Sequence, residues 1–137
     1  MAHWLFKSEP SAWSYEKLAQ CGAAGTDWSG IRNHSAKNNM QAMKVGEVGF
    51  FYHSNEGKEI VGIVEVCKAY RPDPTDASGK FGMVDIRAVR PLPRSVTLEA
   101  VKAEKRLAAM ALVTNSRLSI QPVTAEEWVI ICGMGGL

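Results

Sequence analysis

The sequence VGFFYHSNEGKEIVGIVEV, residues 48–66, contains two runs of β-branched and aromatic residues separated by turn-forming residues. Such runs favour β-strands, and Asn55, Glu56 and Gly57 favour the turn between them. The pattern therefore predicts a β-hairpin. Its strands are apolar on both faces, because Phe50 and Phe51 are neighbours and must point to opposite sides. Strands that are apolar on both faces are typical of a closed barrel or a covered sheet.

Three more strands are predicted outside the hairpin. Residues 3–7 form a short aromatic strand, and residues 81–89 alternate between apolar and polar side chains. Pro91 and Pro93 are expected to end the second of these strands, since proline donates no ladder hydrogen bond. Residues 117–123 form the last strand, with its apolar residues facing inward. The side chains expected to face outward from it are Arg117, Ser119 and Gln121.

Short helices are predicted between the strands. Periodicity and capping residues place them at residues 15–20, 35–43, 97–104 and 107–110, and after a capping box at 124–127. Strands and short helices at uneven spacing do not form a regular βαβ array. They predict an α+β fold, built on a small, mostly antiparallel barrel with helices at its rim. No linker or repeat divides the chain, so residues 1–137 are expected to form one domain.

The composition is that of an ordinary globular protein. The chain has 137 residues, of which 46% are hydrophobic and 22% charged, and a formal net charge of +2. This charge permits a nucleic-acid partner without requiring one. The sequence MAHWLFKSEP at the N-terminus has neither the basic start nor the apolar run of a secretory signal. Its apolar runs are too short to span a membrane, so no membrane association is expected.

The cysteines and histidines suggest neither a disulfide framework nor a metal site. Cys21, Cys67 and Cys132 are far apart and form no CxxC pair, which favours a reducing cytoplasm as the location. The three histidines lack the spacing of zinc ligands. Sequence signatures of nucleophile elbows, dinucleotide-binding loops and phosphate loops are absent from the sequence. We therefore expect no metal and no cofactor.

Four segments place a large aromatic or cationic side chain beside hydrogen-bonding groups, each near a predicted strand end or in a loop. They are Trp4 with Lys7, Ser8 and Glu9; Trp28 with Arg32 and Asn33; Tyr52 with His53 and Ser54; and Arg117 with Ser119 and Gln121. Each segment alone is a weak signal, because exposed charges are usually only solvated. Trp28 is the strongest candidate, since an irregular loop flanked by glycines is an unusual place to bury the largest side chain.

These segments resemble the EVE domain family. The likeness runs in order from Trp4 to Trp128 and is carried by WLFKSEP at 4–10, DWSGIRN at 27–33, FFYHSN at 50–55, IVGIVEV at 60–66 and RLSIQPV at 117–123. The resemblance implies a PUA-like pseudo-barrel related to the YTH domain. It also implies recognition of a modified base in DNA or RNA, such as a methylated or hydroxymethylated cytosine, flipped into an aromatic pocket. The chain departs from the family pattern at His34, where an aromatic residue is expected after Asn33.

Carried over position by position, the resemblance implies one pocket. Its base-binding residues would be Lys7, Ser8, Glu9, Trp28, Arg32, Asn33, Tyr52, His53, Ser54, Ser119 and Gln121. Trp28 and Tyr52 would stack on the base, while Lys7, Arg32 and Arg117 would hold the flanking phosphates. Because unpairing a base costs free energy, a single-stranded or already flipped base is the expected partner.

Two alternatives to a non-catalytic reader remain open at this point. In the first, the protein is a small PUA-like hydrolase that acts on a modified nucleoside, with Lys7 and Glu9 as a nucleophile-activating or acid–base pair. Pro10 disturbs the geometry of that pair, and no third catalytic group is evident in the sequence. In the second, the protein is an interaction module with a vestigial pocket, which the near-neutral charge permits.

Overall fold

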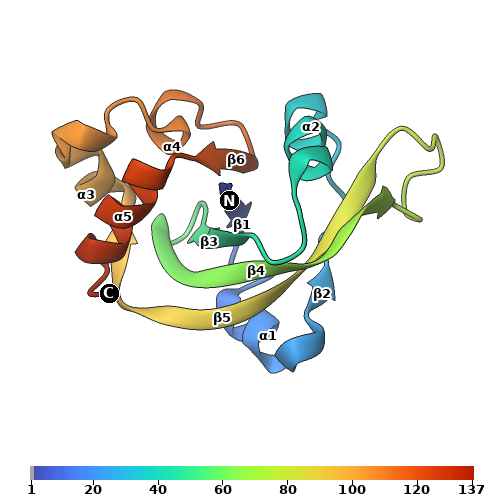
Figure 1. Ribbon diagram of the computed structural model, residues 1–137, viewed down its shortest axis with the longest axis horizontal. Helices are drawn as coiled ribbons and strands as arrows, with labels where there is room; N and C mark the ends of the chain where they lie inside the picture. Colours follow the sequence, from blue (N-terminus) through green and yellow to red (C-terminus); the bar gives the residue numbers. More distant parts are fainter. Residues whose placement is uncertain (1) are drawn as a thin grey trace.

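A six-stranded sheet forms the centre of the computed structural model, which describes residues 2–137 (Figure 1). Its strands follow the order β2-β5-β4-β3-β1-β6. Their bounds are β1 His3–Ser8, β2 Thr26–Asp27, β3 Val48–His53, β4 Glu59–Pro72, β5 Gly82–Thr97 and β6 Ile120–Val123. Strands β1 and β3 are parallel, and every other neighbouring pair is antiparallel. The predicted hairpin is confirmed as β3 and β4.

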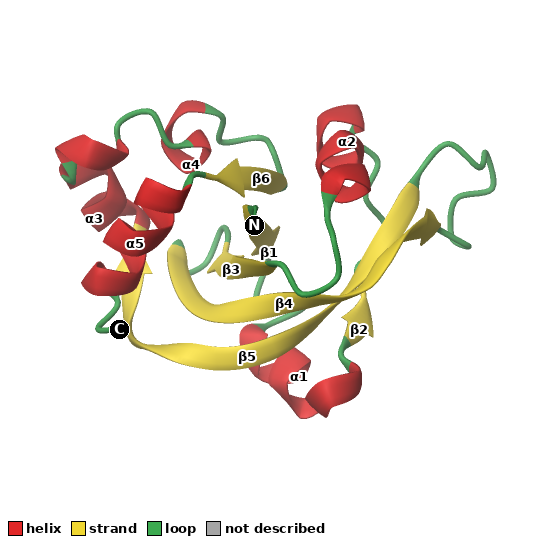
Figure 2. Ribbon diagram, viewed as in Figure 1, coloured by secondary structure: helices red, strands yellow, loops and turns green. Residues whose placement is uncertain are grey.

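Short helices surround the sheet (Figure 2). They are α1 Tyr15–Gln20, α2 His34–Ala42, α3 Leu98–Ala103, α4 Ala111–Thr114 and α5 Ala125–Met134, with 3-10 turns at Gly22–Ala24 and Lys105–Leu107. Side-chain caps begin most of them, because an Asx or hydroxyl oxygen satisfies a free N–H of the first turn. The predicted capping box is present: Thr124 and Glu127 exchange hydrogen bonds at the start of α5.

The sheet curves strongly and is closed by a helix. Strands β4 and β5 bend along their length (Figure 2), and several register shifts interrupt their pairing, as expected where bulges introduce curvature. Helix α2 contacts β6 as well as β4 and β5, so it bridges the open side of the sheet. The Asn39 side chain donates a hydrogen bond to the Ile120 carbonyl, with an N–O distance of 2.7 Å. This arrangement confirms the predicted α+β pseudo-barrel.

Apolar side chains pack on both faces of the sheet. On one face Phe6 and Phe51 pack with residues of α1 and α2, and on the other Leu5 and Phe50 pack with residues of α3, α4 and α5. Successive residues of β1 and β3 therefore belong to opposite clusters, as their alternation requires. These strands are apolar on both faces because each face of the sheet is covered by an apolar cluster.

The predicted end of the fifth strand is wrong. Strand β5 continues through Pro91 and Pro93 to Thr97. Its pairing jumps at this point, because Ile60 lies opposite Val96 whereas Gly62 lies opposite Pro91. The prolines therefore fall in or beside a bulge, where no ladder hydrogen bond is required of them.

The last strand is shorter than predicted, and the helical turn before it lies at other residues than predicted. Strand β6 begins only at Ile120, because Leu118 closes a turn by donating its N–H to the Asn115 carbonyl. The helix expected at residues 107–110 is replaced by the 3-10 turn Lys105–Leu107 and by α4. Within residues 2–137, no helix is long and apolar enough to cross a membrane.

Gly62 allows β4 and α1 to pack closely, because it has no side chain. A Cβ atom at position 62 would lie 2.6 and 2.7 Å from ring carbons of Tyr15, whose hydroxyl donates to the Ile63 carbonyl at 2.8 Å. We expect Gly62→Ala to lower the free energy of unfolding by about 1–3 kcal/mol, as overpacking does. The matched control is Gly133→Ala in α5, where no atom lies within 4 Å and alanine should stabilise by roughly 0.5–1 kcal/mol. Denaturant unfolding measures both, and an equal effect of the two variants would contradict the packing described.

Candidate functional site

Two cavities of similar size adjoin the end of β1. The first, here the Trp28 cavity, has a volume of about 480 Å³ and is lined by Lys7, Ser8, Glu9, Ala12, Trp13, Thr26, Asp27, Trp28, Ser29 and Ile31. The second, here the Tyr52 cavity, has a volume of about 490 Å³ and is lined by Lys7, Ser8, Glu9, Tyr52, Ser54, Asn55, Lys58, Leu98, Leu112, Ser116, Arg117 and Ser119. Both volumes lie in the usual range of small-ligand sites. Three consecutive residues, Lys7 to Glu9, line both cavities.

Trp28 forms a rigid aromatic wall of the Trp28 cavity. Its backbone N–H donates to the Val84 carbonyl at 2.7 Å. Its ring meets Phe6 and Phe51 edge to face, with centroid distances of 6.0 and 5.8 Å. Only 9% of Trp28 is exposed. The core therefore fixes the orientation of the indole, and its remaining accessible surface is available to a flat ligand.

Trp13 is a second aromatic residue of this cavity, and the sequence reasoning missed it. The turn after β1 holds it in place, because its N–H donates to the Glu9 carbonyl at 2.8 Å and its carbonyl accepts from the Ser8 hydroxyl at 2.6 Å. The indole nitrogen Nε1 is buried and has no hydrogen-bond partner within residues 2–137. The available signal was a large aromatic residue in the short segment between the strand predicted at 3–7 and the helix predicted at 15–20.

A buried carboxylate anchors the loop that carries Trp28. Asp73 is 2% exposed. Its oxygens accept hydrogen bonds from the Gly30 N–H at 2.8 Å, from Arg32 Nη1 at 3.1 Å and from the Thr75 N–H and hydroxyl at 2.7 and 2.6 Å. Burial opposes ionisation, but these donors outweigh it and hold the pKa of Asp73 well below its usual range. The β4–β5 loop is thereby joined to residues 28–32.

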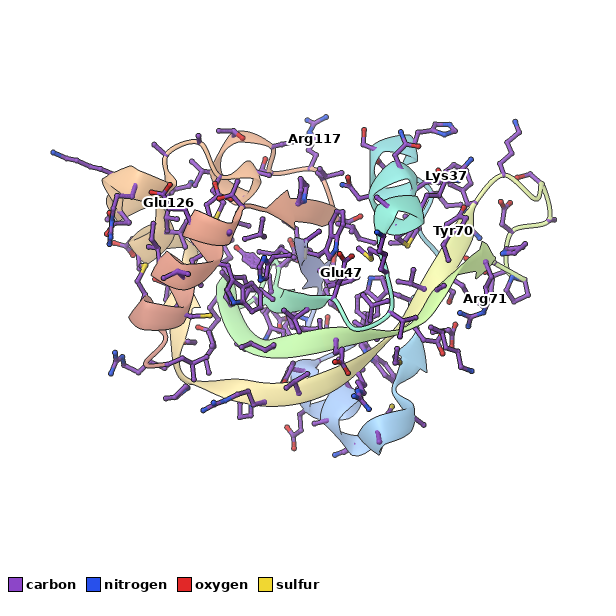
Figure 3. All side chains as sticks on the ribbon, viewed as in Figure 1. Lys37, Glu47, Tyr70, Arg71, Arg117 and Glu126 are labelled. Atoms are coloured by element: carbon purple, nitrogen blue, oxygen red, sulfur yellow. The ribbon has the colours of Figure 1, made fainter. Side chains whose placement is uncertain are left out.

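Aromatic and cationic side chains add to this junction. The Phe81 ring lies 5.0 Å from the His34 ring, centroid to centroid. The Arg32 guanidinium and the Lys37 ammonium lie 5.9 and 5.8 Å from the centroid of Phe81. Figure 3 shows Lys37 on α2, at the side of the molecule where the β4–β5 loop lies. The exposed His34 ring therefore packs against Phe81 of the same protein.

The Tyr52 cavity is rich in cations and hydroxyl groups. Tyr52 is 3% exposed, and the Lys7 ammonium lies 5.9 Å from its ring centroid. Lys7 Nζ also donates to the Ser116 carbonyl at 2.7 Å. Burial lowers the pKa of Lys7 and raises the pKa of Tyr52. The Arg117 side chain points away from the ribbon above β6 (Figure 3).

The structure divides the predicted pocket in two. Trp28 belongs to the apolar cluster on one face of the sheet and Tyr52 to the cluster on the other. The prediction that these two rings stack on one base is therefore wrong. Tyr52 follows Phe51 in an alternating strand, so only Phe51 can face Trp28. Ser54, Arg117 and Ser119 lie with Tyr52.

Four predicted site residues line neither cavity, and each has a structural partner. His53 Nε2 accepts from the Tyr15 N–H at 3.1 Å, and burial lowers the pKa of this histidine. Asn33 Oδ1 caps α2 by accepting from the Ala36 N–H at 2.9 Å. Arg32 is paired with Asp73.

Gln121 is the fourth of these residues, and its predicted outward direction is wrong. Its side chain is 0% exposed. Its amide Nε2 donates to the carbonyls of Asn115 and Leu118, at 3.1 and 3.0 Å. Strand β6 contacts both α2 and α4, and its residues other than Pro122 are buried. Gln121 satisfies carbonyls of the turn before β6.

The described residues contain no obvious metal site. Across residues 2–137, no group of three or more His, Cys, Asp or Glu side chains is arranged to hold an ion. Cys21, Cys67 and Cys132 are unpaired. The absence of metal and redox chemistry stays a prediction.

Comparison with known proteins identifies the family. Residues 2–134 match the EVE domain. Human thymocyte nuclear protein 1 is 34% identical over 165 aligned residues, which cover 97% of this chain and 73% of that protein. A protein from Rhodopseudomonas palustris, solved by NMR, is 63% identical with a TM-score of 0.95, covering 99% of this chain and 94% of that one.

Two solved complexes share the fold. Human THYN1 protein, solved with DNA containing 5-methylcytosine, is 33% identical with a TM-score of 0.92, covering 100% of this chain and 99% of that one. The YTH domain of Zygosaccharomyces rouxii MRB1, at 20% identity and a TM-score of 0.60, shares the fold alone and covers 99% of this chain and 85% of its own. Since the domain match spans nearly all of the sequence, the chain belongs to the EVE domain family.

Proposed function

We propose that this protein is a non-catalytic module that binds a modified nucleobase, flipped out of its strand into the Trp28 cavity. The observation that carries this proposal is the cavity itself, where Trp13 and Trp28 meet polar side chains in a volume of about 480 Å³. The complex of human THYN1 protein with DNA containing 5-methylcytosine supports a methylated cytosine in DNA as the first ligand to test.

The lining of the Trp28 cavity matches the chemistry of a methylated cytosine. Base stacking on an aromatic side chain contributes about 1–3 kcal/mol, and Trp28 offers a preorganised face. The Asp27 carboxylate is suited to accept from the exocyclic amine of cytosine, as acidic side chains do. Trp13 adds a second aromatic surface to the lining. Ala12 and Ile31 supply apolar surface for a methyl group.

The partners of Lys7 and Glu9 favour binding over hydrolysis. Glu9 Oε1 accepts from Asn55 Nδ2 at 2.7 Å, while Lys7 Nζ donates to the Ser116 carbonyl. Each side chain is thus held by a different neighbour, and no hydrogen bond joins the two within residues 2–137. A nucleophile or general acid needs a partner within hydrogen-bond reach. The proposed partner is DNA or RNA with a single-stranded or flipped base, and the cytoplasmic location stays a prediction.

Binding and turnover are tested together with a panel of oligonucleotides, each carrying one modified base, and matched unmodified strands. We expect at least one modified strand to bind more tightly than its match, with no change in nucleoside mass after long incubation. Glu9→Gln should alter affinity only modestly, because Glu9 contacts the ligand through at most one hydrogen bond. Loss of the modified nucleoside in the presence of the native protein, but not of Glu9→Gln, would establish the hydrolase instead.

A further inference from the structure

The Tyr52 cavity adjoins the proposed base site but lies against the opposite apolar cluster of the sheet. We propose that it binds the sugar and phosphodiester of the nucleotide next to the flipped one, an inference that rests on the proposed function. Lys7, Ser8 and Glu9 line both cavities, so a strand whose base enters the Trp28 cavity reaches the Tyr52 cavity across three residues.

The charges of the Tyr52 cavity suit an anion. Three cationic side chains, Lys7, Lys58 and Arg117, line it together with one carboxylate, Glu9. That carboxylate already accepts a hydrogen bond from Asn55. The remaining polar groups are mainly hydroxyls, which donate readily to phosphate oxygens and to sugar oxygens.

Tyr52 provides a hydroxyl group that no protein atom of the described residues binds. The residue is 97% enclosed, lines the cavity, and makes no side-chain hydrogen bond within residues 2–137. Burial alone raises the pKa of its hydroxyl, with no hydrogen bond opposing that effect. Its hydroxyl oxygen keeps some accessible surface, so it can donate a hydrogen bond to a ligand oxygen in the cavity. Lys7 lies beside the same ring and would place its charge next to that oxygen.

The aromatic face of Tyr52 is not free to stack a second base. The Lys7 ammonium lies over the ring at 5.9 Å, and the residue belongs to the apolar cluster beneath α3, α4 and α5. Leu98 and Leu112 complete the apolar part of the lining. A wall with apolar surface and hydroxyl donors fits a sugar ring, and the cations fit its phosphate. The cavity is therefore suited to backbone rather than base.

A third hollow extends the path. It is lined by Gly57, Lys58, Thr97, Leu98, Glu99 and Lys102, and shares Lys58 and Leu98 with the Tyr52 cavity. The strand would thus leave the base site toward α3. The order of the three hollows gives the path of the backbone over the protein.

The test compares a modified nucleoside, its 3′- and 5′-monophosphates, the corresponding dinucleotides and inorganic phosphate. The readout is the ratio of dinucleotide affinity to nucleoside affinity. We expect one of the phosphates to raise affinity about tenfold, the usual effect of hydrogen bonds to a charged group. Tyr52→Phe removes only the hydroxyl and should bring this ratio several-fold closer to one. Arg117→Gln, an exposed change that threatens the fold less, should do the same and lower the salt dependence of dinucleotide binding.

Lys44→Gln is the matched control, because Lys44 is exposed and precedes β3, whose other end carries Tyr52. It should leave the ratio unchanged. The inference is overturned if phosphate adds no affinity, if inorganic phosphate competes as well as the nucleotides, or if neither Tyr52→Phe nor Arg117→Gln changes the ratio. Failure of the proposed function would give a different result. Modified and unmodified ligands would then bind with equal affinity, whatever the ratio of dinucleotide affinity to nucleoside affinity.

Discussion

Replacing Trp28 with alanine is expected to abolish the preference for a modified base and also to destabilise the fold. The ring is 9% exposed and packs edge to face on Phe6 and Phe51. Truncating such a buried aromatic costs about 3–5 kcal/mol of unfolding free energy. Loss of its stacking face should weaken binding of the modified base by about 1–3 kcal/mol. Thermal unfolding and oligonucleotide titration measure the two effects separately.

Two variants separate binding from stability. Trp28→Phe keeps an aromatic ring in the core and should retain part of the affinity with a smaller loss of stability. Trp128→Ala removes an indole that stacks on Phe50 at 4.1 Å and lines neither cavity. It should destabilise the protein while preserving the base preference. If Trp128→Ala and Trp28→Ala reduced the preference equally, the Trp28 cavity would not be the base site.

Asp73→Ala is expected to have the second-largest effect, although Asp73 lines neither cavity. The substitution removes the acceptor of the Gly30 and Thr75 N–H groups and frees Arg32. Loss of these bonds should lower the free energy of unfolding by about 2–4 kcal/mol. Affinity should fall as well, because the loop that carries Trp28 loses its anchor. Asp73→Asn should not restore it, since an amide N–H₂ group would face two donors.

The Asp73 carboxylate also makes the free energy of unfolding depend on pH in the acid range. A folded-state pKa below the ordinary value of 3.8 means that ionised Asp73 stabilises the fold above that value. This contribution is lost as the pH falls below 3.8 and through the lower folded-state pKa. Thermal unfolding as a function of pH should therefore show a steeper acid loss in the native protein than in Asp73→Asn. Parallel curves for the two proteins would contradict the role of Asp73.

The sequence was sufficient to predict the structure where a pattern of residues is compatible with only one local structure. Residues 48–66 are apolar on both faces and can only form a covered hairpin, and Trp28 lies in a turn-rich loop that offers it a cavity wall. It was insufficient where one residue type serves two purposes. Asn33 and His53 have the hydrogen-bonding groups of a binding site, but both groups cap helix N-termini.

The division into two cavities follows from the alternating directions of side chains along β3. Phe51 and Tyr52 are neighbours in a strand, so a ring that meets Trp28 must come from Phe51. The prediction placed Trp28 and Tyr52 in one pocket because both are aromatic, and it did not consider which face of the strand Tyr52 occupies. Gln121 was misassigned for a related reason, because its amide binds carbonyls of the turn before β6, and the strand pattern does not reveal that turn. Trp13 was missed because its turn is shaped by contacts with Ser8 and Glu9.

The four tryptophans allow the most direct test of the base site. In a ¹H–¹⁵N spectrum each indole N–H gives its own signal. Trp13 and Trp28 line the proposed site, whereas Trp4 donates to Glu47 in the core at 3.1 Å and Trp128 lies on α5. Titration with a single-stranded oligonucleotide carrying one 5-methylcytosine should shift the Trp13 and Trp28 signals and leave those of Trp4 and Trp128 in place. The unmodified strand should shift them less at the same concentration. Unchanged Trp13 and Trp28 signals at saturation, or equal shifts with both strands, would contradict recognition of the modified base in this cavity.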